Sequence, residues 1–579
     1  MEESGHRRSN TMQTIRREEP TMADQNTDVY SNSSTGTPPL RRHVGRIGLL
    51  FASIGSIIGS GWLFGAMNAS QIAGPAAVIS WGLGGLMILL IGLCYAELGA
   101  MFPLSGGVVR FPHIAFGGFS SYMTGWITWV ACASVAPIEV EAALTYATKY
   151  APFTSRHTVG GATVHTLTGL GMVVAVIAMA VFVVINYYGI RWFAAVNNVV
   201  VWWKLAIIAI VIAAFMLTQF NTDNFTSQGF KPDGWHGIFT AIATSGIVFS
   251  YLGFRQGIEL AGESDNPKRN VPFAVIGSVL LTVVIYVLLQ VAFIGSVNPS
   301  DIASGWSNIS FTNDFGPLAA IASILGLGWL ATLLYIDAVI SPAGTGLIYT
   351  TVTARISYAM SRNGNAPESL GRTTHRGVPL VSMILAFVVG LILFLPFPSW
   401  QQLVGFITSA TVLSFGSGPL AVVTFRKQIP NQRRPFKLPF VYVIAFLAFW
   451  SANLIVYWTG WSTNFKLFIA VLIGVVMLGV MVALDAENDR HISWDWQGAV
   501  WYLPWLGGLA LISWLGDYGG GLGVLHFDTA FPVTFVFSGI IFALAWWVKL
   551  PTPAVERYIA EAREEAAEED EVLGAAMSH

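Results

Sequence analysis

Long apolar runs follow one another along almost the whole chain, separated by short polar segments. A helix that rises 1.5 Å per residue needs about 20 residues to cross about 30 Å of hydrocarbon, and the runs have this length. They are continuous and lack the alternation of membrane-barrel strands. The pattern predicts an all-α, polytopic membrane protein with about 14 spans. The spans are expected at about 45–69, 76–102, 117–150, 166–187, 192–217, 236–262, 272–297, 317–359, 379–397, 401–425, 437–458, 464–484, 498–516 and 530–548.

The positive charges predict the orientation, because Lys and Arg of short loops stay on the cytoplasmic side. With an internal N-terminus, the external loops hold only Arg156, Lys231 and Lys466, with Lys149 at a span end. This asymmetry favours an even number of spans and two cytoplasmic termini. The internal loops hold Arg110, Arg191, Lys268, Arg269, Arg362, Arg372, Arg376, Arg426, Lys427, Arg433, Arg434 and Lys437.

Composition agrees with a membrane protein, since 54% of the residues are hydrophobic and 11% are charged, against roughly 25% charged in soluble domains. A net charge of -2 argues against nucleic-acid binding. Cys94 and Cys132 lie inside apolar runs without paired spacing, so neither a disulfide nor a metal site is indicated. The motifs HExxH, GxSxG and GxxxxGK[ST] are absent from the sequence, which indicates no enzyme and no cofactor.

The first apolar run is interrupted near its middle by glycines and serines, between Gly55 and Gly61. Glycine costs about 1 kcal/mol relative to alanine inside a helix. Unwound backbone is tolerated at membrane depth only where its polar groups line a cavity or find partners. Close helix packing through Gly55-x-x-x-Gly59 is the alternative explanation.

The sixth apolar run has its own interruption, between Gly246 and Gly257. Broken segments at corresponding positions of two halves indicate a transporter built from inverted repeats, with its site at the repeat interface. This pairing favours a binding site over simple helix packing.

Four stretches carry motifs in the order and spacing of one known family. They are Gly55–Gly61, Tyr95–Gly99 with Pro103–Gly107, Leu260–Pro272, and Arg355–Pro367. Together they resemble the permeases of the amino acid-polyamine-organocation (APC) superfamily, most of all their bacterial aspartate-proton symporter branch. The resemblance covers roughly residues 44 to 430 and implies a LeuT-type five-plus-five inverted repeat, followed here by four extra C-terminal helices.

On this basis the chain divides into five parts. They are a disordered cytoplasmic tail at 1–43, the first repeat with spans 1–5 at 44–217, the second repeat with spans 6–10 at 236–426, accessory spans 11–14 at 436–549, and an acidic, Ala-rich cytoplasmic tail at 550–579 that can form a solvated helix.

Lys204 lies deep within the fifth run, where a charge costs about 2.5 to 3.5 kcal/mol on insertion scales. In the permeases that the sequence resembles, a lysine followed by leucine at this place sets its ammonium against span 1 and replaces the second sodium ion of sodium-coupled relatives. Burial disfavours the charged amine, so Lys204 is a candidate proton carrier. A permanently charged lysine that caps span-1 carbonyls is the alternative.

Arg255 follows the second break, at a place where the superfamily often has glutamate. A guanidinium can bind a carboxylate through two parallel hydrogen bonds, which points to an acidic substrate. An internal pair with Glu259 or Asp337 is the alternative. Glu139 and Glu141 are about 200° apart on one helix, so only one of them can face a given water path.

Asp337 is expected to partner a buried cation, and Glu97, Glu263 and Arg355 are expected to form gating or anchoring ion pairs at cytoplasmic span ends. The positive end of the half-helix after the first break suits a substrate carboxylate, and unwound carbonyls suit its ammonium. Phe249, Tyr251 and Trp62 are candidate gating aromatics. The expected substrate-binding residues are Ser56, Ile57, Gly59, Ser60, Gly61, Phe249, Ser250, Tyr251, Gly253 and Arg255.

The sequence therefore predicts a proton-coupled amino acid symporter of the cell membrane, for aspartate or glutamate. Uptake or exchange of neutral or cationic amino acids is the alternative within transport. A membrane amino acid sensor without transport is the alternative from another class.

Overall fold

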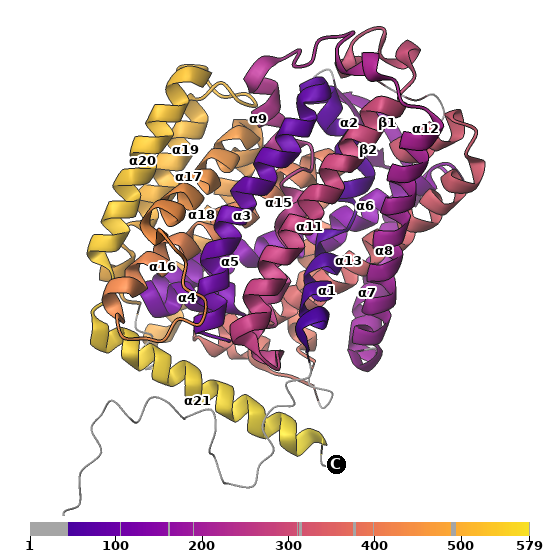
Figure 1. Ribbon diagram of the computed structural model, residues 1–579. Coiled ribbons are helices and arrows are strands. Elements are labelled where there is room, and N and C mark those ends of the chain that lie inside the picture. Colours follow the sequence, from indigo (N-terminus) through magenta and orange to yellow (C-terminus); the bar gives the residue numbers. More distant parts are fainter. Residues whose placement is uncertain are drawn as a thin grey trace, which may run out of the picture. The chain divides into compact units, whose positions relative to one another are not determined.

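The computed structural model describes residues 44–577 except 105, 160–161, 189, 310, 312–314, 375–377, 398 and 488–493. The expected tail at 1–43 lies outside these residues. The expected spans are helical, and most helices run along a common direction in Figure 1.

The first five expected spans and their connections form eight helices. They are α1 (Arg46–Ile57), α2 (Gly61–Ala73), α3 (Ala77–Met101), α4 (Gly107–Phe116), α5 (Gly118–Ala133), α6 (Val135–Ala147), α7 (Gly169–Tyr188) and α8 (Ile190–Thr218). The second five spans and their connections follow as α9 (Gly234–Thr244), the 3₁₀ helix η3 (Phe249–Arg255), α10 (Gln256–Glu259), the 3₁₀ turn η4 (Ala261–Glu263), α11 (Pro267–Ser296), α12 (Pro317–Ile324), α13 (Gly328–Arg362), α14 (Leu380–Leu393), α15 (Trp400–Phe415) and α16 (Ser417–Gln428). The last helices are α17 (Val441–Thr459), α18 (Trp461–Glu487), α19 (Tyr502–Leu515), α20 (Phe527–Val548) and α21 (Thr552–Met577).

Three apolar runs that predict one helix each are divided in the structure. The run at 317–359 breaks between α12 and α13, where Gly326 has a φ of 75° that other residues rarely adopt. The run at 117–150 breaks at Ser134, whose hydroxyl donates to the Val130 carbonyl at 2.8 Å, a contact that bends helices. The run at 401–425 breaks at Gly416 between α15 and α16.

Among the described residues, 11 helices are long and apolar enough to cross a membrane, or 12 if the bent pair of α9 and the segment Phe249–Glu259 counts as one span. That pair bends by 46°. The helices α1 and α14 are apolar but shorter. The number 14 therefore stays a prediction, as does the cytoplasmic location of both termini.

One hairpin departs from the all-helical expectation. Strands β1 (Thr154–Val159) and β2 (Ala162–Leu167) pair antiparallel, with Arg156 opposite His165. Arg156 donates to the Phe311 carbonyl at 3.4 Å, so the hairpin is tied to the segment before α12.

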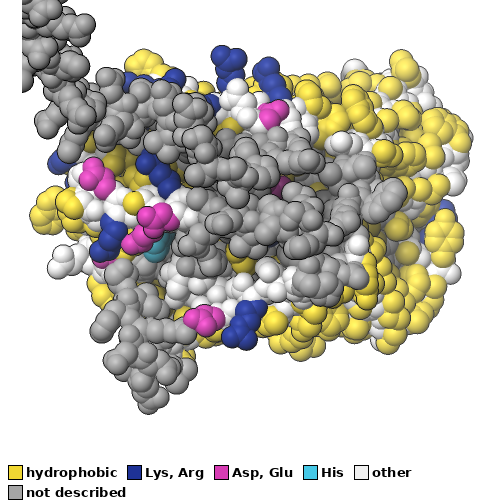
Figure 2. All heavy atoms as spheres, turned by 90° about the horizontal axis from the view of Figure 1, so that it is seen from below, with side chains coloured by type: hydrophobic (Ala, Val, Ile, Leu, Met, Phe, Trp, Pro, Cys, Tyr) yellow, Lys and Arg dark blue, Asp and Glu magenta, His cyan; other side chains and the backbone are white. Residues whose placement is uncertain are grey.

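The outer faces of several helices are apolar and exposed, as expected for contact with lipid. On α7 the exposed residues Val173, Ile177, Val181 and Val184 follow the helical repeat on one side. Seen from below Figure 1, the molecule shows charged side chains on this end and hydrophobic side chains along its flank (Figure 2). Charged ends and apolar flanks are what a bilayer requires.

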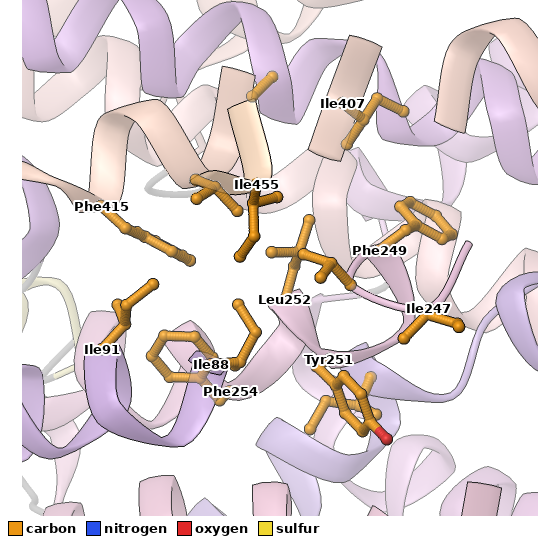
Figure 3. Packing of buried hydrophobic residues seen from close by; sticks show 14 of the residues in the cluster. Ile88, Ile91, Ile247, Phe249, Tyr251, Leu252, Phe254, Ile407, Phe415 and Ile455 are labelled. Carbon is orange, nitrogen blue, oxygen red and sulfur yellow. The ribbon is translucent and has the colours of Figure 1, made fainter. Parts of the chain in front are cut away.

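The interior is built around the second break. Helix α3 packs against α11, and α1 packs against α11, α8 and η3, while α17 contacts α3, α9, α15 and α16. Hydrophobic side chains of η3 meet those of α3, α15 and α17, including Ile91, Phe415 and Ile455 (Figure 3). The broken segment η3 is thus enclosed on all these sides by other helices.

Candidate functional site

The two broken helices touch one another through glycine. A Cβ atom on Gly253 of η3 would lie 2.3 Å from the Ile57 nitrogen and 2.4 Å from the Ser56 carbonyl carbon. Real Cβ atoms do not come this close to backbone, so only glycine allows the contact. At Gly253, close backbone approach and helix interruption therefore occur together.

The two broken helices also approach each other closely between Gly61 of α2 and Ser250 of η3. A Cβ atom on Gly61, the first residue of α2, would lie 2.1 Å from the Ser250 hydroxyl. Ser250 itself donates to the Gly246 carbonyl at 2.7 Å. The break of the first span, Ile58 to Ser60, therefore lies directly beside the beginning of η3.

Lys204 reaches the break of the first span from α8. Its side chain is 1% exposed. The ammonium donates to the carbonyls of Gly55 at 2.9 Å and Ile58 at 2.5 Å, and to the Thr345 hydroxyl at 3.2 Å. Neither carbonyl has a helical partner, because α1 ends at Ile57 and α2 begins only at Gly61. The Lys204 ammonium and the Thr345 hydroxyl are the donors placed against them.

Glu139 of α6 approaches the break from the opposite side. Its carboxylate accepts the Ser60 backbone N–H at 2.8 Å, and its other oxygen would lie 2.5 Å from a Cβ atom on Gly59. Lys204 and Glu139 lie within electrostatic range of one another. A carboxylate thus already occupies the N-terminal end of α2, where the macrodipole favours negative charge.

A small cavity lies between the two breaks. Polar groups from α1, α6 and α13 face apolar side chains in it, and Glu139 is the one charged residue among the described residues that line it. The lining consists of Ser56, Ile57, Val135, Glu139, Phe249, Leu252, Thr345, Tyr349, Ile407 and Thr411. A site of this kind can hold a small zwitterion between half-helix ends.

The structure brings most of the predicted site residues together. Ser56, Ile57 and Phe249 line the cavity, and Gly59, Ser60, Gly61, Ser250 and Gly253 form the crossing of the two breaks. Thr345, Tyr349 and Thr411 line the cavity without having been predicted. They come from continuous helices that carry no break or buried charge at these positions, so the sequence gives no signal for them.

Tyr251 was predicted to bind substrate and to act as a gating aromatic, but it lies outside the cavity lining. Its hydroxyl donates to the Trp81 carbonyl at 3.2 Å, and its ring packs on Trp81 and Tyr286. Figure 3 shows the side chains of Phe249 and Tyr251 pointing in different directions. The short helical turn of η3 places neighbouring side chains on different faces, so Phe249 and Leu252 line the cavity and Tyr251 does not. Trp62 is buried outside the lining as well.

Arg255 also lies outside the cavity lining. It forms an ion pair with Glu259 at 3.1 Å in which both side chains are buried, and it donates to the Cys132 sulfur at 3.0 Å. This is the internal pair that the sequence left as an alternative. The other alternative partner, Asp337, accepts hydrogen bonds from Trp203 and Ser341 and lies within electrostatic range of Lys204.

The remaining charges divide between the membrane interior and its ends. Glu141 is buried, and neither of its oxygens has a hydrogen-bond partner among the described residues. Glu97 pairs with Arg426 at 2.6 Å and with Arg434 at 3.5 Å, and it accepts the Leu438 N–H. Glu263 pairs with Arg355 at 2.9 Å, as expected for an ion pair at a span end.

These features define a class of protein: a multi-pass membrane transporter of the LeuT type, with two discontinuous helices that cross at a central site. The sequence agrees, because residues 44–478 match the amino acid permease family. The chain belongs to this family, which confirms the APC superfamily resemblance and places the chain in the plasma membrane.

Relatives with assigned substrates cover most of the chain. The glutamate/serine transporter AimA of Bacillus subtilis (strain 168) is 39% identical over 492 residues, which are 84% of this chain and 90% of the relative. The aspartate-proton symporter of the same organism is 35% identical over 510 residues, 88% of this chain and 96% of the relative. The branched-chain amino acid permease BcaP of this Bacillus subtilis strain is 27% identical over 467 residues, which are 77% of this chain and 94% of the relative.

Proposed function

We propose that this chain is a proton-coupled amino acid symporter whose substrates include aspartate or glutamate. The observation that carries the proposal is the position of Lys204, whose ammonium binds the carbonyls of Gly55 and Ile58 beside the carboxylate of Glu139. The names of the relatives at 39% and 35% identity support acidic substrates and proton coupling.

The geometry suggests how proton and substrate are linked. An amino acid's α-carboxylate is expected to bind the N-terminal end of α2, but Glu139 accepts the Ser60 N–H there at 2.8 Å. Two carboxylates at one site repel each other. A proton on Glu139 removes this repulsion and frees the N–H for the substrate, so substrate binding requires proton uptake.

Lys204 completes the cycle in this proposal. When the substrate leaves, Glu139 releases its proton. Its carboxylate is then stabilised again by the positive charge of Lys204 and of the N-terminal end of α2. Asp337, within electrostatic range of Lys204, stabilises the ammonium from the side of α13. The break thus alternates between a protonated, substrate-bound state and an ionised, empty state.

The cavity lining favours a second substrate class as well. Among the described lining residues, the hydroxyls of Ser56, Thr345, Tyr349 and Thr411 are present and no Lys or Arg is. A small neutral amino acid such as serine fits this lining, in keeping with the name of the glutamate/serine relative. Cationic amino acids have only Glu139 as a charged partner among these residues.

Uptake into proteoliposomes tests the proposal. Radiolabelled glutamate, aspartate, serine and arginine are supplied with an imposed pH gradient and, separately, an imposed voltage. A monoanion that moves with one proton carries no net charge, so the pH gradient is expected to drive its uptake and voltage is not. A second proton would add a response of about 2.3 kcal/mol per 100 mV. Uptake driven by sodium, or binding without flux, would contradict the proposal.

A further inference from the structure

Three charged residues lie on the segment 255–263, and a fourth on α13 completes a set in which each charge neighbours one of opposite sign. Arg255, Glu259 and Glu263 succeed one another at intervals of four residues, and Arg355 of α13 faces them. Arg255 pairs with Glu259, and Arg355 pairs with Glu263. Glu259 lies within electrostatic range of both arginines. We call this set of four residues the charge ladder.

The end of the charge ladder formed by Arg255 and Glu259, its upper pair, lies next to the cavity. Arg255 is within electrostatic range of Tyr349, which lines the cavity, and its guanidinium lies 5.9 Å from the centre of the Phe415 ring. The pair of Arg255 and Glu259 is buried, with side-chain exposures of 1% and 8%. The pair of Arg355 and Glu263 is much more open, at 44% and 39%.

The two pairs connect different parts of the fold. Arg255 also donates to Cys132 of α5, so the upper pair joins η3 and α10 to α5. The lower pair joins η4 to α13. Both pairs therefore hold the inner half of the second broken span against helices that do not belong to it.

A buried ion pair resists simple separation, because each charge would be left without a partner. An acidic substrate offers a route around this barrier, since its side-chain carboxylate can replace that of Glu259 on the Arg255 guanidinium. Glu259 then needs a cation, and Arg355 lies within its electrostatic range. Each of these three charges has a partner before and after the exchange.

We propose that the charge ladder is the subsite for the side-chain carboxylate of acidic substrates, and that it opens the gate below the cavity by exchanging ion-pair partners. The substrate carboxylate pairs with Arg255, Glu259 passes to Arg355, and Glu263 is released toward solvent, which unties η4 from α13. This inference rests on the proposed acidic amino acid transport. It explains how a cavity lined by a carboxylate admits an acidic substrate.

Glu259→Gln tests the exchange in proteoliposomes, with glutamate and serine measured in parallel. The amide keeps the shape and leaves Arg255 freer, so KM for glutamate is expected to fall about three- to tenfold, which corresponds to about 0.6–1.4 kcal/mol. A neutral amide at position 259 cannot draw Arg355 from Glu263, so the maximal rate for glutamate is expected to fall about as much. Serine has no side-chain carboxylate to place on Arg255, so its KM is expected to stay unchanged.

Glu561→Gln is the matched control, because Arg557 and Glu561 form the same four-residue spacing on the exposed surface of α21 at 3.7 Å. It is expected to change transport of neither substrate. Arg355→Gln provides a second measurement. If the exchange occurs, Glu259→Gln and Arg355→Gln together lower the glutamate rate less than the product of their separate effects.

The outcomes separate the exchange from the function on which it rests. A wild-type protein that carries no acidic amino acid overturns both. A wild-type protein that carries glutamate, with Glu259→Gln altering glutamate and serine equally or not at all, overturns the exchange alone. Additive effects of the two variants on glutamate rate overturn it as well.

Discussion

The ammonium of Lys204 lies 2.9 Å from the carbonyl oxygen of Gly55, across the point where the first span stops being helical. This contact joins α8 to the end of α1 and gives the unwound backbone a donor. Substitution of Lys204 can distinguish its two possible roles, a carrier of protons and a permanently charged cap of these carbonyls.

Lys204→Met removes the charge but keeps most of the side-chain length. The Thr345 hydroxyl has one proton for the two carbonyls, so one of them loses its donor at about 1–3 kcal/mol, and the variant is expected to be less stable than the wild type in detergent. If Lys204 takes part in coupling, accumulation driven by a pH gradient is lost while exchange of internal for external amino acid persists. Parallel loss of both activities in a folded variant would instead indicate a permanently charged cap.

Glu139→Gln tests whether a proton on Glu139 controls substrate access. The amide oxygen can still accept the Ser60 N–H, but it carries no charge and does not titrate. The KM for substrate is expected to become nearly independent of pH, whereas in the wild type it rises as pH rises. Proton-driven accumulation is expected to drop at least tenfold.

Glu141→Gln is the control for this experiment. Glu141 lies two residues further along α6, about 200° around the helix axis from Glu139. Its substitution is expected to leave the pH dependence of KM as in the wild type. If both variants flatten the pH dependence alike, the assignment to Glu139 is wrong.

Gly253→Ala tests the crossing of the two breaks. The added Cβ atom would lie 2.3 Å from the Ile57 nitrogen and cannot be relieved by rotation of a side chain. Overpacking of this kind costs about 1–3 kcal/mol or more, and here it also separates the two halves of the site. Uptake is expected to fall at least tenfold. Gly82→Ala of α3, with nothing within 4 Å of its Cβ, is expected to be silent.

The C-terminal helix is predicted to respond to acid. Val555, Tyr558, Ile559 and Ala562 are buried on one face of α21, and the Tyr558 ring lies 4.5 Å from that of His113 in α4. Burial, with the charges of Arg110 and Arg557, lowers the pKa of His113 to about 3. The packing of α21 against α4, which we call docking, therefore favours the neutral form of His113.

The lowered pKa of His113 determines how the docking of α21 changes with pH. Docking is fully stabilised above the ordinary pKa of histidine, about 6.5, and weakens as pH falls from there toward about 3. Limited proteolysis of the intact protein is expected to cleave α21 faster at about pH 4.5 than at about pH 7.5. His113→Phe keeps a ring against Tyr558 but cannot be protonated, so its cleavage rate is expected to change much less. An equal acceleration in both proteins would exclude His113 as the cause.

Sequence alone determined the class and the outline of this protein. Runs of about 20 apolar residues require membrane helices, since backbone groups in lipid must be satisfied within each segment. Glycines at Gly55–Gly61 and Gly246–Gly257 marked both breaks, because glycine weakens a helix wherever it stands. Lys204 was found for a similar reason, as a buried charge is conspicuous in an apolar run.

Only the tertiary structure decided which side chains meet at the breaks. It paired Arg255 with Glu259, turned Tyr251 toward Trp81, and set Glu139 on the Ser60 N–H. Thr345, Tyr349 and Thr411 entered the cavity from helices whose sequences show no interruption there. These contacts depend on helix rotation and on packing between segments far apart in the chain, which local periodicity does not contain.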